Sequence, residues 1–145
     1  MKTTKRRTIG RLAQESGVGV ETIRFYERKG ILRRPPRTIG FREYAESDAV
    51  RIRFVRRAQK LGFTLKEIGE LLSLTLRSGV TCGQVKNRTD AKLAEVEAKI
   101  RDLEQMRGSL QRLSEACGAE DVMAKNCRIL ECFESNGICQ TKEKS

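Results

Sequence analysis

The 145-residue sequence contains no histidine, no tryptophan and only two prolines. Without histidine there is no imidazole to act as a general base, as a metal ligand or as a member of a Ser-His-Asp triad. The chain also has no nucleotide-binding loop, no apolar leader before its first motif, and no apolar run near the ~18 residues that span a bilayer. We therefore expect a cytoplasmic protein that is not an enzyme.

Basic charge is concentrated in the first half of the chain. The whole sequence carries 30 Lys and Arg against 19 Asp and Glu, a net charge of +11. Residues 1–63 hold 17 basic and 6 acidic side chains, whereas residues 64–145 hold 13 of each. The excess of positive charge in the first half indicates a polyanionic partner, such as nucleic acid or an anionic membrane surface.

The same half has the pattern of a helix-turn-helix followed by a wing. Apolar residues at helical spacing predict helices over 8–17 and 20–29, joined by a turn that contains glycine. Two adjacent prolines then end helical structure, and a short alternating run over 39–44 predicts a small hairpin. Further helices are predicted over 47–62, with an apolar face of Val50, Phe54, Ala58 and Leu61, and over 64–74, beginning at a capping box. We expect residues 1–76 to form one basic winged helix-turn-helix domain.

Exposed polar residues of this domain are candidates for contacts with double-stranded DNA. A recognition helix fits the major groove, so the outer face of the helix at 20–29 can reach base edges or phosphates. Basic residues in and before the wing, and a lysine near the end of the third helix, can hold phosphates, which fixes register without reading sequence. The candidates are Thr22, Arg24, Tyr26, Arg34, Arg37, Arg42, Tyr44 and Lys60.

A long helix is predicted after a glycine-containing break. Residues 77–84 are expected to form a hinge, and 85–117 a continuous helix whose apolar residues, from Leu93 to Cys117, step by three and four along one seam. This seam between charged flanks is typical of a coiled coil, and too little apolar sequence remains to cover it, so we expect a homodimer. Residues 118–134 predict a loop and a short helix able to dock on the coil through Ile129, Leu130 and Phe133, and 135–145 a disordered tail.

Three of the five cysteines lie at the ends of the predicted long helix. A helix over 85–116 is roughly 48 Å long at ~1.5 Å per residue, so Cys82 and Cys117 of one chain cannot share a ligand. In an antiparallel homodimer, Cys82 of one chain would meet Cys117 and Cys127 of the other. Three thiolates without imidazole favour a soft ion such as Hg(II), Cd(II) or Pb(II). We interpret Cys132 as a packing residue of the short helix and Cys139 as part of the tail.

Taken together, these segments resemble the MerR family of metal-responsive transcription regulators. The resemblance rests on TIGRLAQESGVGVETIRFYERKGIL, FREY, RFVRRAQKLGFTLKEIGELL and the three cysteines, and covers residues 7 to about 133. It implies a dimer, joined by an antiparallel coiled coil, that binds a palindromic operator and bends and untwists promoter DNA for RNA polymerase when metal binds. It also implies DNA contacts by Arg24, Tyr26, Arg42, Tyr44 and Lys60, and metal ligation by Cys82, Cys117 and Cys127.

Within that family, GVGVETIRFYERKG and RFVRRAQKLGF are most like the mercury-sensing branch. We therefore expect repression without metal and activation with Hg(II). Nine residues separate Cys117 from Cys127, slightly more than in mercury sensors; zinc-sensing relatives share a longer loop but usually carry a histidine and another cysteine where this chain has Gly118. Pb(II), Cd(II) and Zn(II) are the alternative inducers. From other classes, the alternatives are a thiol-redox regulator that uses Cys82 and Cys117, and a metal-free module that organises DNA.

Overall fold

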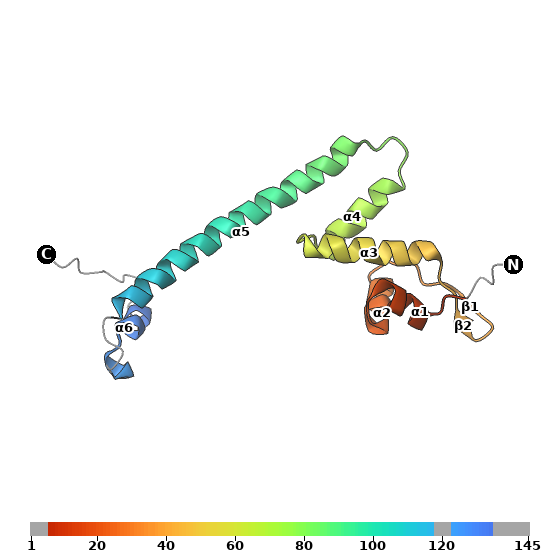
Figure 1. Ribbon diagram of the computed structural model, residues 1–145. Coiled ribbons are helices and arrows are strands. Elements are labelled where there is room, and N and C mark those ends of the chain that lie inside the picture. Colours follow the sequence, from red (N-terminus) through yellow and green to blue (C-terminus); the bar gives the residue numbers. More distant parts are fainter. Residues whose placement is uncertain (1–5, 118–122, 135–145) are drawn as a thin grey trace. The chain divides into compact units, whose positions relative to one another are not determined.

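The computed structural model describes residues 6–117 and 123–134, which are mainly helical (Figure 1). The chain divides into two compact units, Met1–Lys92 and Leu93–Ser145. The result confirms the predicted class: a winged helix-turn-helix, a long helix and a short final helix. In chain order the elements are α1 (Ile9–Ser16), α2 (Val20–Arg28), β1 (Arg37–Thr38), β2 (Phe41–Arg42), α3 (Glu46–Lys60), α4 (Leu65–Thr75), α5 (Cys82–Ala116), the 3-10 turn η1 (Ala124–Asn126) and α6 (Arg128–Glu134).

The turn between α1 and α2 is built on one glycine. The N–H of Gly17 bonds back to the last turn of α1, and its φ of +63° is the left-handed conformation that glycine adopts without a steric cost. The guanidinium of Arg56 donates a 2.9 Å hydrogen bond to the Gly17 carbonyl oxygen. This contact supplies a donor to a carbonyl at the end of α1 and joins the helix-turn-helix to α3.

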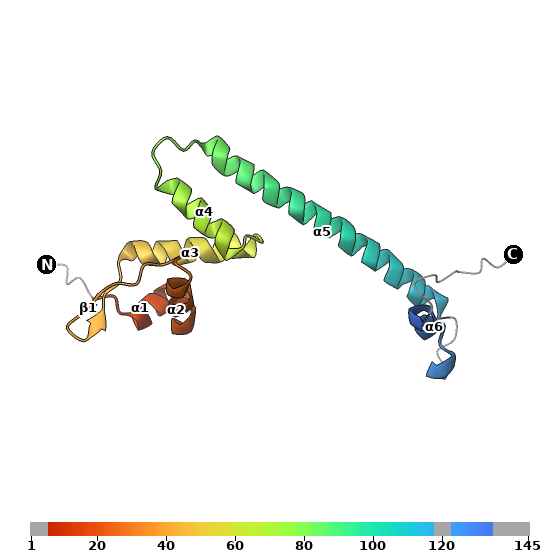
Figure 2. The same ribbon diagram turned by 180° about the vertical axis from the view of Figure 1, so that it is seen from behind.

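The first unit packs around α3. In both views, α1 and α2 lie on one side of this helix and α4 lies on the other (Figures 1 and 2). Fully buried aliphatic side chains come from all four helices, so the predicted pairs of helices share a single core. The largest of these side chains are Leu12, Ile23, Ile52, Val55 and Ile68.

The buried face of α3 differs from the predicted one. Ala49, Ile52, Val55 and Ala58 are buried, whereas Val50, Phe54 and Leu61 are exposed. The sequence around α3 carries two apolar stripes, and helical spacing alone does not show which one faces the core. The core takes the stripe of Ala49, Ile52, Val55 and Ala58, and of the predicted face only Ala58 belongs to it.

The predicted wing is confirmed as a two-stranded antiparallel hairpin. Arg37 pairs with Arg42 and Thr38 with Phe41. The two residues of the connecting turn, Ile39 and Gly40, both have positive φ values, as a two-residue type I′ hairpin turn requires.

The predicted capping box at the start of α4 is confirmed. The Thr64 hydroxyl accepts a hydrogen bond from the Glu67 N–H, and the Glu67 carboxylate accepts one from the Thr64 N–H at 2.7 Å. A related pattern explains why α5 begins at Cys82, three residues before the predicted start: the Thr81 N–H donates to the side chain of Gln84. Cys82 is therefore a helical residue.

The apolar seam of α5 faces solvent in the single chain. Its exposed members are Leu93, Val96, Ile100, Leu103, Met106 and Leu110. On α6, Leu130 and Phe133 are exposed as well, so the expected docking of this helix through them is not seen within the described part of the second unit. In the regions that the structure describes, no helix is both long and apolar enough to cross a membrane.

Candidate nucleic-acid interface and metal ligands

Two of the predicted recognition residues lie on the accessible side of α2. Arg24 is exposed, and its guanidinium lies 3.2 Å from Oε1 of Glu21, one turn earlier on the helix. Thr22 is half-buried in the first turn. An exposed pair such as Arg24–Glu21 contributes little to stability, so the guanidinium can exchange this carboxylate for a stronger anion.

Tyr26 does not lie on the outer face of α2, and this prediction of its position is wrong. Its side chain is 3% exposed, and its hydroxyl donates a 3.0 Å hydrogen bond to Oε1 of Gln59 on α3. Burial raises the pKa of this phenol. The helical period explains the difference, since Tyr26 follows Ile23 by three residues and both face the core.

The basic residues in and before the wing differ in their exposure and in their partners. Arg37 on β1 is exposed, whereas Arg42 on β2 is half-buried and donates to the carbonyl oxygen of Pro35. The guanidinium of Arg34 lies 3.8 Å from Oε2 of Glu27. The wing therefore presents one exposed cation, Arg37, beside a second, Arg42, that is hydrogen-bonded to the backbone.

Tyr44 is also a core residue and not an exposed wing residue, so this part of the prediction is corrected. It is 3% exposed, and its hydroxyl donates to Oε1 of Glu27 at 2.7 Å. Burial, and then the hydrogen bond to Glu27, raise the pKa of Tyr44 to about 12. In the short alternating pattern of the wing, Tyr44 follows Arg42 by two residues, so both were expected on the same face. The strand ends at Arg42, however, and the Tyr44 side chain is buried.

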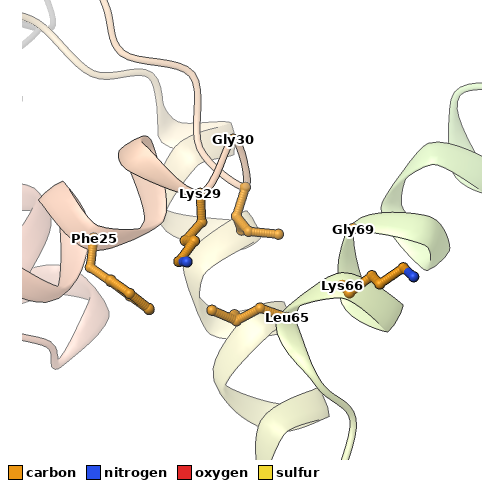
Figure 3. Close-up of a pocket in the computed structure, with 7 residues that line it drawn as sticks. Phe25, Lys29, Gly30, Leu65, Lys66 and Gly69 are labelled. Carbon is orange, nitrogen blue, oxygen red and sulfur yellow. The ribbon is translucent and has the colours of Figure 1, made fainter.

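An apolar and basic groove lies between the end of α2 and the start of α4. It has a volume of about 640 Å³, and Phe25 and Lys29 on the α2 side face Leu65 at the start of α4, while the Lys66 side chain points away from them (Figure 3). Lys60, the last residue of α3, is exposed as predicted for a phosphate contact. Lys29 and Lys66, which line this groove, were not among the predicted candidates for DNA contacts.

Three cysteines are free thiols, the same three that the sequence singles out. Cys82 opens α5 and is exposed, Cys117 directly follows α5 and is exposed, and Cys127 precedes α6 and is half-buried. Cys82 is the first of the 35 residues of α5 and Cys117 follows the last of them, so the length of the helix, roughly 50 Å, lies between the two. Among the residues described, no three His, Cys, Asp or Glu side chains come together as a metal site within one chain.

The other two cysteines have no part in this trio. Cys132 on α6 is disulfide-bonded, in contrast to its interpretation as a packing residue. A sulfur in a disulfide is not a thiolate, so Cys132 is not available as a ligand in this state. Cys139 and the predicted disordered tail lie outside the described residues, as does the start of the predicted loop over 118–126.

Two family models match the chain along most of its length. The model described as "MerR HTH family regulatory protein" matches residues 7–75, and the one described as "MerR, DNA binding" matches residues 49–113. Together they span the winged helix-turn-helix and most of α5.

Individual relatives cover most of the chain as well. The mercuric resistance operon regulatory protein of Shigella flexneri is 48% identical over 113 residues, 77% of each protein. The transcription regulator PbrR691 from Ralstonia metallidurans CH34, solved in complex with lead(II), is 36% identical with a TM-score of 0.78, covering 86% of this chain and 97% of that one. The dual function regulator MerR from Bacillus megaterium MB1, solved with mercury(II), is 34% identical with a TM-score of 0.67, covering 84% and 94%.

Proposed function

The chain belongs to the MerR family of transcriptional regulators, and from this premise we propose that it represses a promoter without metal and activates it when Hg(II) binds. It is a metal-responsive regulator and not an enzyme. The observation that carries the finer proposal is the set of three free thiols at the two ends of α5, in a chain without histidine.

Operator binding is assigned to the first unit. We expect Arg24 and Thr22 on α2 to reach into the major groove. Phosphate contacts are assigned to Arg34, Arg37, Arg42 and Lys60. The concentration of the chain's net positive charge in residues 1–63 supports this assignment, because phosphate neutralisation supplies much of the affinity for DNA. A dimer of such units fits a palindromic operator in the cytoplasm, where RNA polymerase reads the promoter.

Dimerisation is assigned to the exposed seam of α5. Aliphatic side chains at steps of three and four are a coiled-coil surface, and an antiparallel pairing of two α5 helices buries it in a homodimer. This pairing brings the start of one α5 beside the end of the other. Cys82 of one chain then lies near the partner's Cys117 and Cys127, which one chain alone does not bring together.

The residues present fit a thiophilic ion. The donor set is all sulfur and carries no imidazole, which favours Hg(II), Cd(II) or Pb(II) over Mg(II) or Ca(II), and it lacks the fourth ligand that Zn(II) prefers. Hg(II) supplies strong bonds to thiolates when bound.

The regulatory step follows from the assembly of the site from two chains. A metal ion shifts a conformational equilibrium only if it binds one arrangement of the protein better than another. Because the coordinating cysteines come from both chains, the arrangement that the ion favours is that of the dimer. The winged units fixed to that dimer then set how far the intervening DNA is bent and untwisted. The promoter is thus controlled by DNA deformation and not by a change in base contacts.

The choice of Hg(II) over Pb(II), Cd(II) and Zn(II) is tested by promoter activation. Transcription from the cognate promoter is measured with each ion, alongside metal titration of the purified protein. We expect the largest activation with Hg(II) and two ions per dimer. Stronger activation by Pb(II), Cd(II) or Zn(II) at equal free concentration would assign the sensor to that ion.

Cysteine variants separate metal sensing from DNA binding. Cys82→Ser should bind operator DNA with unchanged affinity and lose activation. Loss of DNA binding in Cys82→Ser would contradict the division of roles. Activation by a thiol oxidant without any metal would instead support a redox regulator that uses Cys82 and Cys117.

A further inference from the structure

The one buried residue of α5 is a lysine. Lys92 is 7% exposed, whereas the aliphatic residues of the seam that begins at Leu93 face solvent. Lysine is rarely buried to this degree unless its ammonium is paired. Lys92 is also the last residue of the first compact unit. A buried charge thus marks the point at which α5 leaves that unit.

The Lys92 side chain contacts the turn between α3 and α4. Its Nζ lies 2.9 Å from Oε1 of Glu67 and 5.6 Å from the centre of the Phe63 ring. Its stem runs beside Gly62, where an added Cβ would lie 3.9 Å from Lys92 Cδ. The lysine therefore contacts three consecutive features of one corner: the glycine turn, the aromatic ring and the first turn of α4.

Glu67 divides its two carboxylate oxygens between two helices. Oε2 accepts hydrogen bonds from the N–H and the hydroxyl of Thr64, at 2.7 and 3.0 Å, and so caps α4. Oε1 receives the ammonium of Lys92. The backbone hydrogen bond from Thr64, and then Lys92, lower the pKa of Glu67 to about 2. One side chain thus holds the start of α4 and the body of α5 together.

A second ion pair between the same helices provides an internal comparison. Arg88 on α5 pairs with Glu70 on α4, and these side chains are 52% and 38% exposed, whereas the side chains of Lys92 and Glu67 are 8% and 31% exposed. Exposed pairs contribute little, because water replaces either partner at small cost. Separating the buried ammonium of Lys92 from the Glu67 carboxylate costs more than separating the exposed pair. A displacement of α5 relative to α4 therefore either preserves the Lys92–Glu67 contact or breaks it at that cost.

We propose that Lys92 and Glu67 form a latch that transmits the arrangement of the α5 dimer to the α3–α4 corner of the DNA-binding unit. The corner follows directly after Lys60, the predicted phosphate contact at the end of α3. Lys92 and Glu67 are positioning residues, since neither is assigned a contact with metal or with DNA. The inference rests on the proposed metal response and adds to it the residues through which the response reaches DNA.

The test is a double-mutant cycle with Lys92→Met, which keeps an apolar stem, and Glu67→Gln, which keeps an acceptor for the cap. Three quantities are measured for each variant: operator affinity, metal affinity, and the ratio of transcription with metal to that without. We expect each single variant to lower the ratio by about five-fold or more, and the double variant to lower it no further. Both affinities should stay within about three-fold of the wild type.

The matched control is the exposed pair, through Arg88→Gln and Glu70→Gln, for which the ratio should stay within about two-fold. If Lys92→Met fails to fold, Lys92→Arg, which retains the charge, should keep most of the response, and Glu67→Gln alone should not. A wild-type ratio in folded Glu67→Gln or Lys92→Met would overturn the latch. So would effects that multiply in the double variant.

A metal-independent measurement keeps the latch separate from the proposed function. By reciprocity, operator binding should change amide hydrogen exchange along α5 beyond Lys92 in the wild type, and not in Lys92→Met. If no metal ion activates transcription by the wild type, the proposed function is wrong, but the hydrogen-exchange measurement still tests the latch. Equal DNA-induced exchange changes in both proteins would overturn it.

Discussion

The hydroxyl of Tyr44 donates a 2.7 Å hydrogen bond to Oε1 of Glu27, and so joins the end of the wing to the recognition helix α2. The Tyr44 N–H also donates to the carbonyl oxygen of Arg7 at 2.9 Å. The two strands of the wing are two residues long each, too short to hold their position alone. The position of the wing relative to α2 therefore depends on a buried side chain behind it.

Replacing Tyr44 by phenylalanine should loosen this connection. Tyr44→Phe leaves the Glu27 carboxylate without a buried donor, which should lower the free energy of unfolding by about 1–3 kcal/mol and weaken operator binding. The matched control is Tyr26→Phe, which removes a bond to the neutral amide of Gln59 and should cost about 0.5–1.5 kcal/mol. Urea unfolding of both variants checks the order, and a larger loss in Tyr26→Phe would contradict it.

The two tyrosines make alkaline pH a direct probe of the core. Tyr44 has a pKa raised to about 12 in the folded state, so folding favours the neutral phenol. This contribution to stability is fully present below the unfolded pKa of about 10 and is lost as pH rises from there toward 12. Because the chain has only these two tyrosines and no tryptophan, tyrosinate absorbance reports on Tyr26 and Tyr44 alone. Titration of both near pH 10 in the native protein would contradict the buried arrangement.

A metal site shared between chains should be restored by mixing two inactive variants. Cys82→Ser keeps Cys117 and Cys127, and a Cys117→Ser, Cys127→Ser double variant keeps Cys82, so neither homodimer holds a full set of thiols. A mixed dimer should have one full set and bind one ion. The measurement is metal stoichiometry in co-expressed, doubly tagged dimers. Binding by either homodimer, or none by the mixed dimer, would show that the ligands are not shared as proposed.

A charge in the exposed seam should prevent dimerisation. Leu103 is 62% exposed in the single chain, and in the proposed coiled coil its side chain would be buried. Leu103→Asp should raise the dimer dissociation constant by about 100-fold or more, because an unpaired carboxylate would be buried. Sedimentation measures this, with Arg101→Asp on the polar flank as the control. Equal dissociation constants for the two variants would place the interface elsewhere.

Local signals in the sequence predicted most of the elements. Gly17 and the capping box of Thr64 and Glu67 fixed helix ends because their hydrogen bonds are made within a few residues. The glycine at the tip of the wing did the same for the hairpin. At the start of α5, the Thr81–Gln84 pair was a local signal of the same kind that the prediction missed.

Features that depend on tertiary packing could not be predicted in the same way. Helical spacing offers two faces for α3, and only the approach of α1 and α4 selects the one with Ile52 and Val55. Tyr26 and Tyr44 have both an apolar ring and a polar hydroxyl, so their type fits a core or a DNA surface equally. The free thiols were identified from residue type and spacing, but their grouping depends on a second chain.

The exposed seam of α5 also bears on how long each copy of the protein survives. A newly made subunit presents a row of aliphatic side chains to the cell until it meets a second one. Quality-control proteases recognise such surfaces, so unpaired subunits should be degraded faster than dimers. Pairing depends on the square of subunit concentration, and the cellular level of active regulator should therefore fall more steeply than gene dosage.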